Sequence, residues 1–317
     1  MWQIEPLDTT VEKLTSILIV IDAGDEAHRL IEKAVMLAHR YNARLELFLC
    51  DSDQAHALRH TYDQAGAEEA RQECVARGQR YLDAVTRTIA EDVLISTHVA
   101  FESPLYEAVV HRVQQGRHDL VMKSPAGKHP MQRITLDPND WQLARTCPVP
   151  LMLTRSLPWS RQMRFVAAID VPRPEGAELA RSVLHTAGYL AQCCDAELDV
   201  VYSDREEGNA TDHAMRTDSV CRVVNEFRIR HEHLHVLQGD PEKTLPGFVA
   251  QLSCDVMVLG ALTRRNSISA LVGTLTSELV DTLECDFVLV KPETYSCPVA
   301  EHTRPLGGSA GLQHLTT

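Results

Sequence analysis

The residues from Gly260 to Thr274 have the types and the spacing that a phosphate-binding loop needs. They follow a short apolar run at 255–259 and lead into a helical pattern that begins near Thr274. A glycine lets the backbone come close to an anion, and a helix start offers free N–H groups and the positive end of its dipole. Gly260, Gly273 and Thr274 therefore predict a cradle for phosphate groups at the end of a strand.

Strands that alternate with helices must position this loop, and the chain shows such an alternation twice. Apolar runs predict strands at 16–22, 44–50, 93–100, 119–123 and 149–154, and again at 164–170, 196–203, 232–238, 255–259 and 286–291. Between them, stretches such as 26–40 and 178–192 carry apolar residues at helical spacing. This alternation predicts an α/β fold built from parallel βαβ units.

Three of the predicted strands recur in the same order in both halves, which indicates two homologous domains. We expect a first domain at 1–154, a linker at 155–163, a second domain at 164–292 and a flexible tail at 293–317. The last strand of each half would leave an apolar sheet edge. Pairing 150–154 with 287–291 would remove both edges, so we expect these two segments to pair with each other.

The loop also resembles a known pattern. Gly260, Thr263, Gly273 and Thr274 match the G-x2-G-x9-G-[ST] nucleotide loop of the universal stress protein family (the UspA superfamily), with Thr263 at the second glycine. Residues 135–147 are similar to a distinctive segment in the first domain of tandem members of the UspE type. The resemblance implies two tandem universal stress domains, each a five-stranded parallel sheet of order 3-2-1-4-5 flanked by helices.

The same resemblance implies where a ligand would lie. In a sheet of that order the crevice opens beyond the carboxyl ends of the strands, where the winding direction reverses. Asp170 and Ser203 would then face an adenine, and Gly239 would lie beside the ribose and the phosphates. The nucleotide-binding residues carried over are Asp170, Ser203, Gly239, Gly260, Thr263, Gly273 and Thr274.

The ligand implied by the resemblance is ATP, or AMP or ADP, with Mg²⁺ as a companion cation. Family behaviour also implies a homodimer, with protein partners that the sequence does not identify. The function implied is a role in stress response or signalling, in which the occupied state is recognised rather than turned over.

Thr263 departs from the family pattern and leaves two interpretations open. If the family glycine has a positive φ, a β-branched residue costs about 1–2 kcal/mol there, and each 1.4 kcal/mol lowers the affinity roughly tenfold. If the glycine serves only close approach, the threonine hydroxyl donates to a phosphate instead. Arg264 and Arg265 either pair with phosphates or form a solvated loop face.

The corresponding loop of the first half lacks these features. Lys123 replaces the leading glycine, and Leu136 and Asp137 occupy the Gly-Thr positions, where an aspartate would repel a phosphate. Pro125 and Pro138 remove backbone donors. We therefore predict that the first half binds no nucleotide by this route and serves as a structural partner or holds a different ligand.

Other chemistry finds less support. His231, His233 and His235 alternate along a predicted edge strand, where they would either hold a divalent metal or discourage strand addition, and we predict no metal site. The sequence contains no nucleophile elbow, Walker A or zinc-protease motif, so we predict that the protein is not an enzyme. Slow ATP hydrolysis, with Asp170 and Asp240 on Mg²⁺, and a nucleotide-free interaction scaffold are the alternatives.

Composition narrows the setting. The net charge is −13 and the pI is near 5.6, with no basic run, which argues against nucleic-acid binding. No apolar run reaches the length of a membrane span, and no secretory signal begins the sequence. The nine cysteines show no disulfide or metal spacing, so reduced thiols and a cytoplasmic location are expected.

Overall fold

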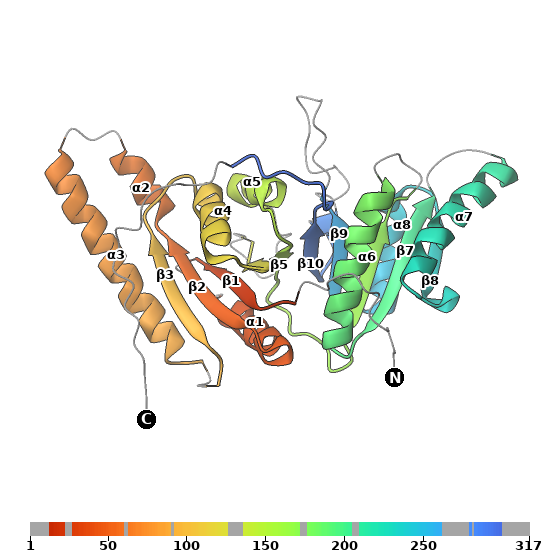
Figure 1. Ribbon diagram of the computed structural model, residues 1–317, viewed down its shortest axis with the longest axis horizontal. Helices are drawn as coiled ribbons and strands as arrows, with labels where there is room; N and C mark the ends of the chain where they lie inside the picture. The colour runs from red at the N-terminus through yellow and green to blue at the C-terminus, as the bar shows by residue number, and fades with distance from the viewer. Residues whose placement is uncertain are drawn as a thin grey trace.

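The described part of the chain forms one ten-stranded sheet with helices on both faces (Figure 1). The computed structural model describes residues 13–22, 27–59, 63–89, 92–125, 136–171, 176–204, 209–261, 279–280 and 282–299. The strand order is β3-β2-β1-β4-β5-β10-β9-β6-β7-β8. The expected α/β fold is confirmed.

The elements of the first half come in the order that the apolar runs predict. They are β1 (Ser16–Ile21), α1 (Ala27–Tyr41), β2 (Arg44–Cys50), α2 (Ser52–Leu58), α3 (Gln64–Thr86), β3 (Ile95–Ala100), α4 (Leu105–Gly116), β4 (Leu120–Lys123), α5 (Pro138–Thr146) and β5 (Leu151–Leu153).

The second half repeats this plan. Its described elements are β6 (Arg164–Ile169), α6 (Gly176–Cys193), β7 (Glu197–Asp204), α7 (Ala210–Glu226), the short 3-10 helix η1 (His231–His233), β8 (Leu234–Gln238), α8 (Pro241–Leu252), β9 (Val256–Gly260) and β10 (Asp286–Val290).

Each half has its strands in the order 3-2-1-4-5, as expected. In the first half β1 pairs in parallel with β2 and β4, and in the second half β6 pairs in parallel with β7 and β9. The halves join through an antiparallel pair, in which Phe287 lies opposite Leu153 and Leu289 opposite Leu151. β5 and β10 lie side by side in the centre of Figure 1, so the expected pairing of the last strands is confirmed.

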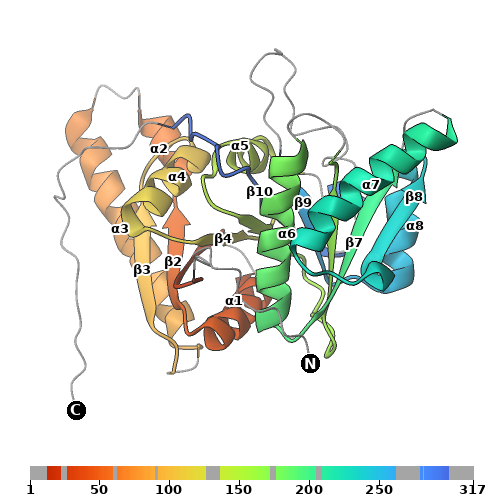
Figure 2. The same cartoon turned by 45° about the vertical axis from the view of Figure 1, so that its right-hand side comes forward.

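Alternating side chains on the strands fill two hydrophobic layers, one on each face of the sheet. Ile17 and Ile19 of β1 pack in the layer that includes α1, α3, α6 and α7, while Leu18 and Val20 pack in the layer that includes α4, α5 and α8. Figure 2 shows α6 and α7 over one face of the second half. None of the helices in the described ranges combines the length and the apolar character that crossing a membrane requires.

A buried ion pair links helix α1 of the first half to strand β10 of the second half. Lys33 of α1 lies with its Nζ 2.7 Å from Oδ2 of Asp286, the first residue of β10, and both side chains are almost fully buried. Asp286 also accepts hydrogen bonds from the Arg155 N–H at 2.7 Å and the Trp159 indole N–H at 2.8 Å. Arg155 and Trp159 belong to the segment between β5 and β6, which contains no helix or strand. The domain boundaries themselves stay a prediction.

The segment after β10 returns to the first half. Lys291, Tyr295 and Cys297 donate side-chain hydrogen bonds to the carbonyls of Ala144, Arg145 and Thr146, respectively. These carbonyls belong to the last turn of α5, whose C=O groups have no partner within the helix. Residues 300–317, the larger part of the predicted tail, lie outside the described ranges.

Candidate functional site

Four of the residues predicted to bind a nucleotide lie at the carboxyl ends of four adjacent strands. Asp170 follows β6, and Gly260 ends β9, which pairs with β6 so that Leu259 lies opposite Ala168. Ser203 lies near the end of β7, the other neighbour of β6, and Gly239 follows β8. The winding direction reverses between β6 and β9, which is where ligands bind in open α/β sheets.

A hydrogen bond joins two of these residues. The Ser203 hydroxyl donates to the Gly239 carbonyl at 2.9 Å and lies 2.8 Å from the hydroxyl of Thr244 on α8. The bond closes the ends of β7 and β8 against the start of α8. Ser203 and Gly239 are therefore held together at the carboxyl ends of β7 and β8, and their contact with a nucleotide stays a prediction.

Each of the two described glycines also has a structural reason to be glycine. A Cβ on Gly260 would lie 2.4 Å from Leu179 Cδ2 of α6, so the helix packs directly on the strand end. Gly239 has a φ of 112°, which side chains rarely adopt. Neither glycine by itself is therefore evidence for a phosphate-binding site. The remaining predicted residues, Thr263, Gly273 and Thr274, lie outside the described ranges, as do Arg264 and Arg265.

In the first half, the equivalent crevice is occupied by the protein's own side chains. Lys123 ends β4, as Gly260 ends β9, and its ammonium lies 3.1 Å from Asp22 Oδ2 and 3.0 Å from Asp140 Oδ1. The Lys123 side chain is 2% exposed and that of Asp140 is fully buried. Burial alone would lower the pKa of Lys123, but the charges of Asp140 and Asp22 outweigh it and raise that pKa above its ordinary value.

The start of helix α5 in the first half is also satisfied from within. The Asp137 carboxylate accepts a hydrogen bond from the Asp140 N–H at 2.7 Å, and Asp140 accepts one from the Asp137 N–H at 3.4 Å. This capping box places two carboxylates where a phosphate would need free N–H groups. These carboxylates would repel a phosphate at this position, and the absence of nucleotide binding in this half stays a prediction.

A buried cluster beside Ser203 was missed by sequence reasoning. Asp204, whose side chain is fully buried, lies 2.7 Å from His213 Nδ1 and 2.9 Å from Arg216 Nε. Burial would raise the pKa of Asp204, but the hydrogen bonds from His213 and Arg216 dominate and lower it. The cluster fixes α7 to the end of β7. The spacing of His213 and Arg216, three residues apart on one helix, was the available signal.

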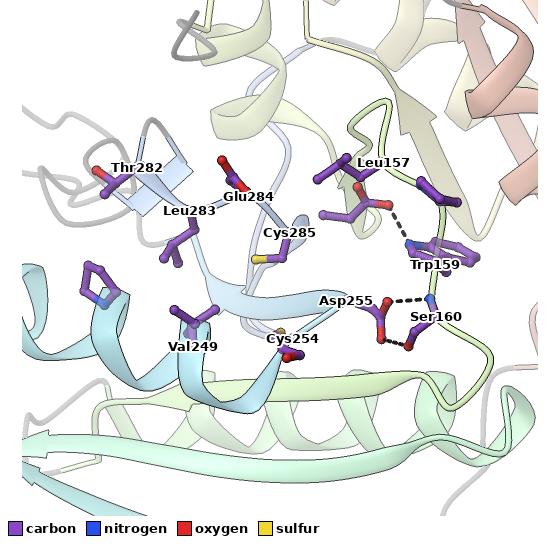
Figure 3. Close-up of a pocket in the computed structure, with 15 residues that line it drawn as sticks. Leu157, Trp159, Ser160, Val249, Cys254, Asp255, Thr282, Leu283, Glu284 and Cys285 are labelled. Carbon is purple, nitrogen blue, oxygen red and sulfur yellow. Dashed lines mark hydrogen bonds between the residues drawn. The ribbon is translucent and has the colours of Figure 1, made fainter. Parts of the chain in front are cut away.

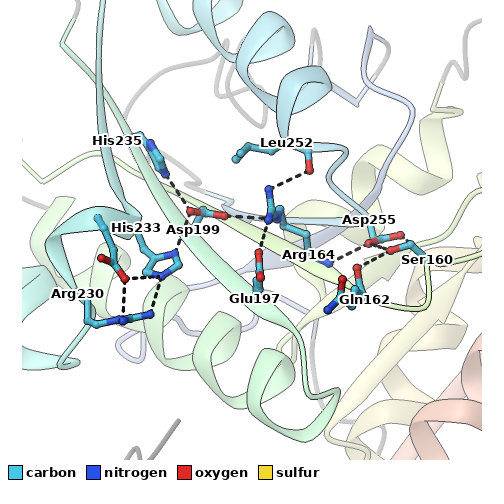
Figure 4. Close-up of polar contacts among 11 residues, drawn as sticks. Ser160, Gln162, Arg164, Glu197, Asp199, Arg230, His233, His235, Leu252 and Asp255 are labelled. Carbon is cyan, nitrogen blue, oxygen red and sulfur yellow. Dashed lines mark hydrogen bonds and ion pairs between the residues drawn. The ribbon is translucent and has the colours of Figure 1, made fainter. Parts of the chain in front are cut away.

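The three alternating histidines are not arranged as predicted. His231 and His233 form the 3-10 turn η1, closed by the His233 N–H donating to the Arg230 carbonyl, and only His235 lies in β8. His233 Nδ1 and His235 Nε2 lie 3.2 Å and 2.9 Å from Oδ1 of Asp199 (Figure 4). β8 is the edge strand, as expected.

The remaining polar contacts of this cluster include two guanidinium groups and the Glu232 carboxylate, whose Oε1 lies 3.6 Å from His233 Nε2. Arg164 Nε lies 3.7 Å from the other oxygen of Asp199, and Arg230 contacts His233 (Figure 4). A bound metal ion would be repelled by both guanidinium groups. Within the described ranges, no group of three or more His, Cys, Asp or Glu side chains is placed to hold a metal.

A serine, a histidine and a glutamate meet in the first half, but in the core. His118 Nδ1 lies 2.8 Å from the Ser16 hydroxyl, and its Nε2 lies 3.7 Å from Glu46 Oε2. Ser16 is fully buried and its oxygen accepts a hydrogen bond from Arg44 at 2.9 Å. A substrate has no access to this hydroxyl, so the cluster is structural. Burial lowers the pKa of His118 to about 4.

Comparisons with known proteins agree with this architecture. A family profile described as "Universal stress protein family" matches residues 13–155. Universal stress protein E of Escherichia coli (strain K12) is 23% identical over 303 residues, which cover 90% of this chain and 96% of that protein. The universal stress protein E homolog of Haemophilus influenzae is 22% identical over 309 residues, covering 88% and 98%.

Solved structures show the same fold along the chain. A universal stress protein structure from Pseudomonas aeruginosa UCBPP-PA14 matches with a TM-score of 0.69 and 23% identity, covering 90% of this chain and 95% of that one. One from Archaeoglobus fulgidus DSM 4304 matches with a TM-score of 0.68 and 13% identity, covering 88% and 99%. Residues 13–155 thus match the universal stress protein family, and the chain as a whole is similar to universal stress protein E over about 90% of its length.

Proposed function

We propose that this stress-response protein binds one adenine nucleotide per chain, in the crevice of its second half. The observation that carries the proposal is the convergence of Asp170, Ser203, Gly239 and Gly260 at the reversal point of the sheet. The ligand would be ATP, or AMP or ADP, accompanied by Mg²⁺. Its phosphates would lie against the loop of Gly273 and Thr274, and its adenine beside Asp170 and Ser203.

The difference between the halves supports this placement. Parallel strands end at equivalent points in both, but the first crevice holds the ion pairs of Lys123 with Asp22 and Asp140. A nucleotide there would have to displace a buried lysine and approach the carboxylates of Asp137 and Asp140. Phosphate binding is therefore expected in the second half alone.

The nucleotide-bound form of the protein would then be recognised by other proteins in the cytoplasm. Two chains would associate as a homodimer. No residue is proposed to be catalytic. Asp240, which was considered as a Mg²⁺ ligand, pairs with Lys243 at 2.9 Å.

A nucleotide-free scaffold is the second candidate, and one observation favours it. Gly260 is required by the packing of Leu179, and Gly239 by its backbone conformation. Both would therefore remain in a chain that had stopped binding nucleotides.

Equilibrium titration calorimetry with ATP and Mg²⁺ separates the two candidates. We expect one site per chain in the unaltered protein and loss of binding in Gly273→Asp, because a carboxylate would face the phosphates. Asp170→Ala should weaken binding, whereas Asp22→Ala, its counterpart in the first half, should leave it unchanged. Absence of binding by the unaltered protein would favour the scaffold, and equal binding by Gly273→Asp would refute the proposed placement of the phosphates.

A further inference from the structure

A second cavity lies at the amino ends of β9 and β10, away from the carboxyl ends where the nucleotide crevice opens. Its volume is about 690 Å³, and it is bounded by the linker, by helix α8 and by the residues that precede β10. In Figure 3 the side chains of Val249 and Leu283 lie on one side of it, and those of Leu157 and Trp159 on the other. Leu157 is 53% exposed. A cavity of this size with apolar walls and a few polar groups is typical of a binding site.

The first half has a matching position, and there the protein's own chain fills it. β5 and β10 are the last strands of their halves and pair with each other, so the segment that follows each strand runs along the opposite half. After β10, the Tyr295 hydroxyl donates to the Arg145 carbonyl at 2.7 Å, and the Cys297 thiol donates to the Thr146 carbonyl at 3.2 Å. Cys297 and Val299 pack against the hydrophobic layer that includes α4 and α5. A short segment without helix or strand therefore covers the end of α5.

The linker leaves the corresponding position of the second half open. It continues into β6 and packs toward the other face of the sheet, where the Trp159 ring contacts the layer that includes α1 and α6. The Trp159 indole N–H donates to Asp286 at 2.8 Å. The next residue, Ser160, donates its N–H and its hydroxyl to the Asp255 carboxylate at 2.7 Å and 2.6 Å. In the described ranges, no segment takes the place beside α8 that residues 295–299 take beside α5.

The rim of the cavity is acidic. Glu284 is exposed and forms no ion pair with the described side chains. Asp255 accepts hydrogen bonds from neutral groups only. Asp286 is paired with Lys33 at 2.7 Å, and the Arg155 guanidinium donates to two backbone carbonyls. Three carboxylates thus face two cations, and the C-terminal end of α8 adds to the negative potential. A bound cation is favoured here, with Glu284 as its partner.

We propose that this cavity binds a short peptide segment of a partner protein, in which a lysine or arginine is followed closely by an aromatic residue. The aromatic ring fills the space between Val249 and Leu283, and the cation pairs with Glu284. The segment after β10 has this pattern, with the Lys291 ammonium 5.3 Å from the centre of the Tyr295 ring, and it is the segment that fills the matching position of the first half. A buried aromatic anchor within a polar rim is typical of protein interfaces.

The test uses the full chain without nucleotide and a fluorescent synthetic peptide of residues 291–299, acetylated and amidated at its ends, under reducing conditions. We expect saturable one-site binding in fluorescence anisotropy, which is lost when alanine replaces Tyr295 in the peptide. Ala250→Trp in the protein should weaken binding by at least about tenfold, because the indole occupies part of the cavity. Gln251→Trp is the matched control, since Gln251 is exposed on the same helix and does not line the cavity.

The charge at the rim is tested separately. Glu284→Gln should weaken peptide binding about two- to fivefold, the range expected for one exposed ion pair, and should reduce its salt dependence. Glu73→Gln, which changes an exposed glutamate of α3 in the first half, should leave binding unchanged. Equal affinities of the Glu284→Gln and unaltered proteins would contradict the assigned cation contact.

Photo-crosslinking locates the bound peptide in the unaltered protein. With benzoylphenylalanine in place of Tyr295 in the peptide, crosslinks mapped by mass spectrometry should fall in α8 and in residues 282–285. Crosslinks confined to α5, where the peptide would have displaced the protein's own segment, would overturn the proposal. Absence of saturable binding, or equal binding by Ala250→Trp, would also overturn it. Since no nucleotide is present, these outcomes are independent of the proposed nucleotide site.

Discussion

Replacing Lys33 by methionine is expected to destabilise the protein by about 3–5 kcal/mol, the usual cost of leaving one charge of a buried pair alone. The Lys33 and Asp286 side chains are only 4% and 2% exposed, and 2.7 Å separates their charged atoms. Methionine has nearly the same length as lysine, so the change removes the charge and leaves little cavity. Asp286 would keep its bonds to Arg155 and Trp159 but lose its only close cation among the described side chains.

Most of the stability lost in Lys33→Met comes from leaving the Asp286 carboxylate buried without a counter-ion. The lost attraction between Lys33 and Asp286 contributes less. Burial lowers the pKa of Lys33 and raises that of Asp286 despite their mutual attraction, so the pair gains little net free energy. Adding Asp286→Asn to Lys33→Met should therefore recover part of the stability. An acid whose folded pKa is raised stabilises the fold below its unfolded pKa and loses that contribution as pH rises. The difference in unfolding free energy between the unaltered protein and Lys33→Met should therefore be smaller at pH 5 than at pH 7.

Equilibrium urea denaturation of the four members of this mutant cycle measures these differences. Arg181→Met is the matched control, because Arg181 and Glu226 form an ion pair whose side chains are 48% and 44% exposed. An exposed pair of this kind contributes about 0–1 kcal/mol. If Lys33→Met lowered the free energy of unfolding no more than Arg181→Met does, the buried Lys33–Asp286 pair would not be important for holding the two halves together.

Three further outcomes are expected. Burial lowers the pKa of His118 in the folded protein from its ordinary value of 6.5 to about 4, so stability should fall by about 3 kcal/mol as the pH falls from 7 to 4, because the unfolded chain binds the proton more readily. The His118→Gln variant should lack this part of the slope in pH-dependent denaturation. Gly260→Ala should lower stability by about 1–3 kcal/mol without any nucleotide present, since its Cβ would overlap Leu179, and unchanged thermal melting would contradict this packing. Lys123→Met should destabilise the chain by about 3–5 kcal/mol, because it leaves the buried Asp140 carboxylate without its cation. Calorimetry of this variant should show no second ATP site, since the capping box of α5 remains. The appearance of a second site would refute the role given to the capping box.

Local patterns in the sequence were enough to predict the strands, whereas their order in the sheet came from the family resemblance. Apolar runs of four to eight residues predict buried strands, and the recurrence of those runs predicts the duplicated plan. The pairing of β5 with β10 followed from the cost of two exposed apolar edges. The positions of Asp170 and Gly260 at adjacent strand ends followed from the strand order.

Contacts between distant residues could not be predicted in this way. Lys33 and Asp286 are 253 positions apart, and no periodicity connects a helix of one half to a strand of the other. The packing of Leu179 against Gly260 depends on the angle at which α6 crosses β9. The histidine pattern failed for a different reason, since alternate spacing also fits a tight turn followed by a strand.

Hydrogen–deuterium exchange of the chain with and without ATP and Mg²⁺ tests the central claim most directly. Nucleotide should slow exchange in the peptides that contain Asp170, Ser203, Gly239 and the 260–274 loop, and should leave the peptides around Lys123 and Asp140 unchanged. Equal protection in both halves, or none near the carboxyl ends of β6 to β9, would contradict an account in which only the second crevice receives the ligand.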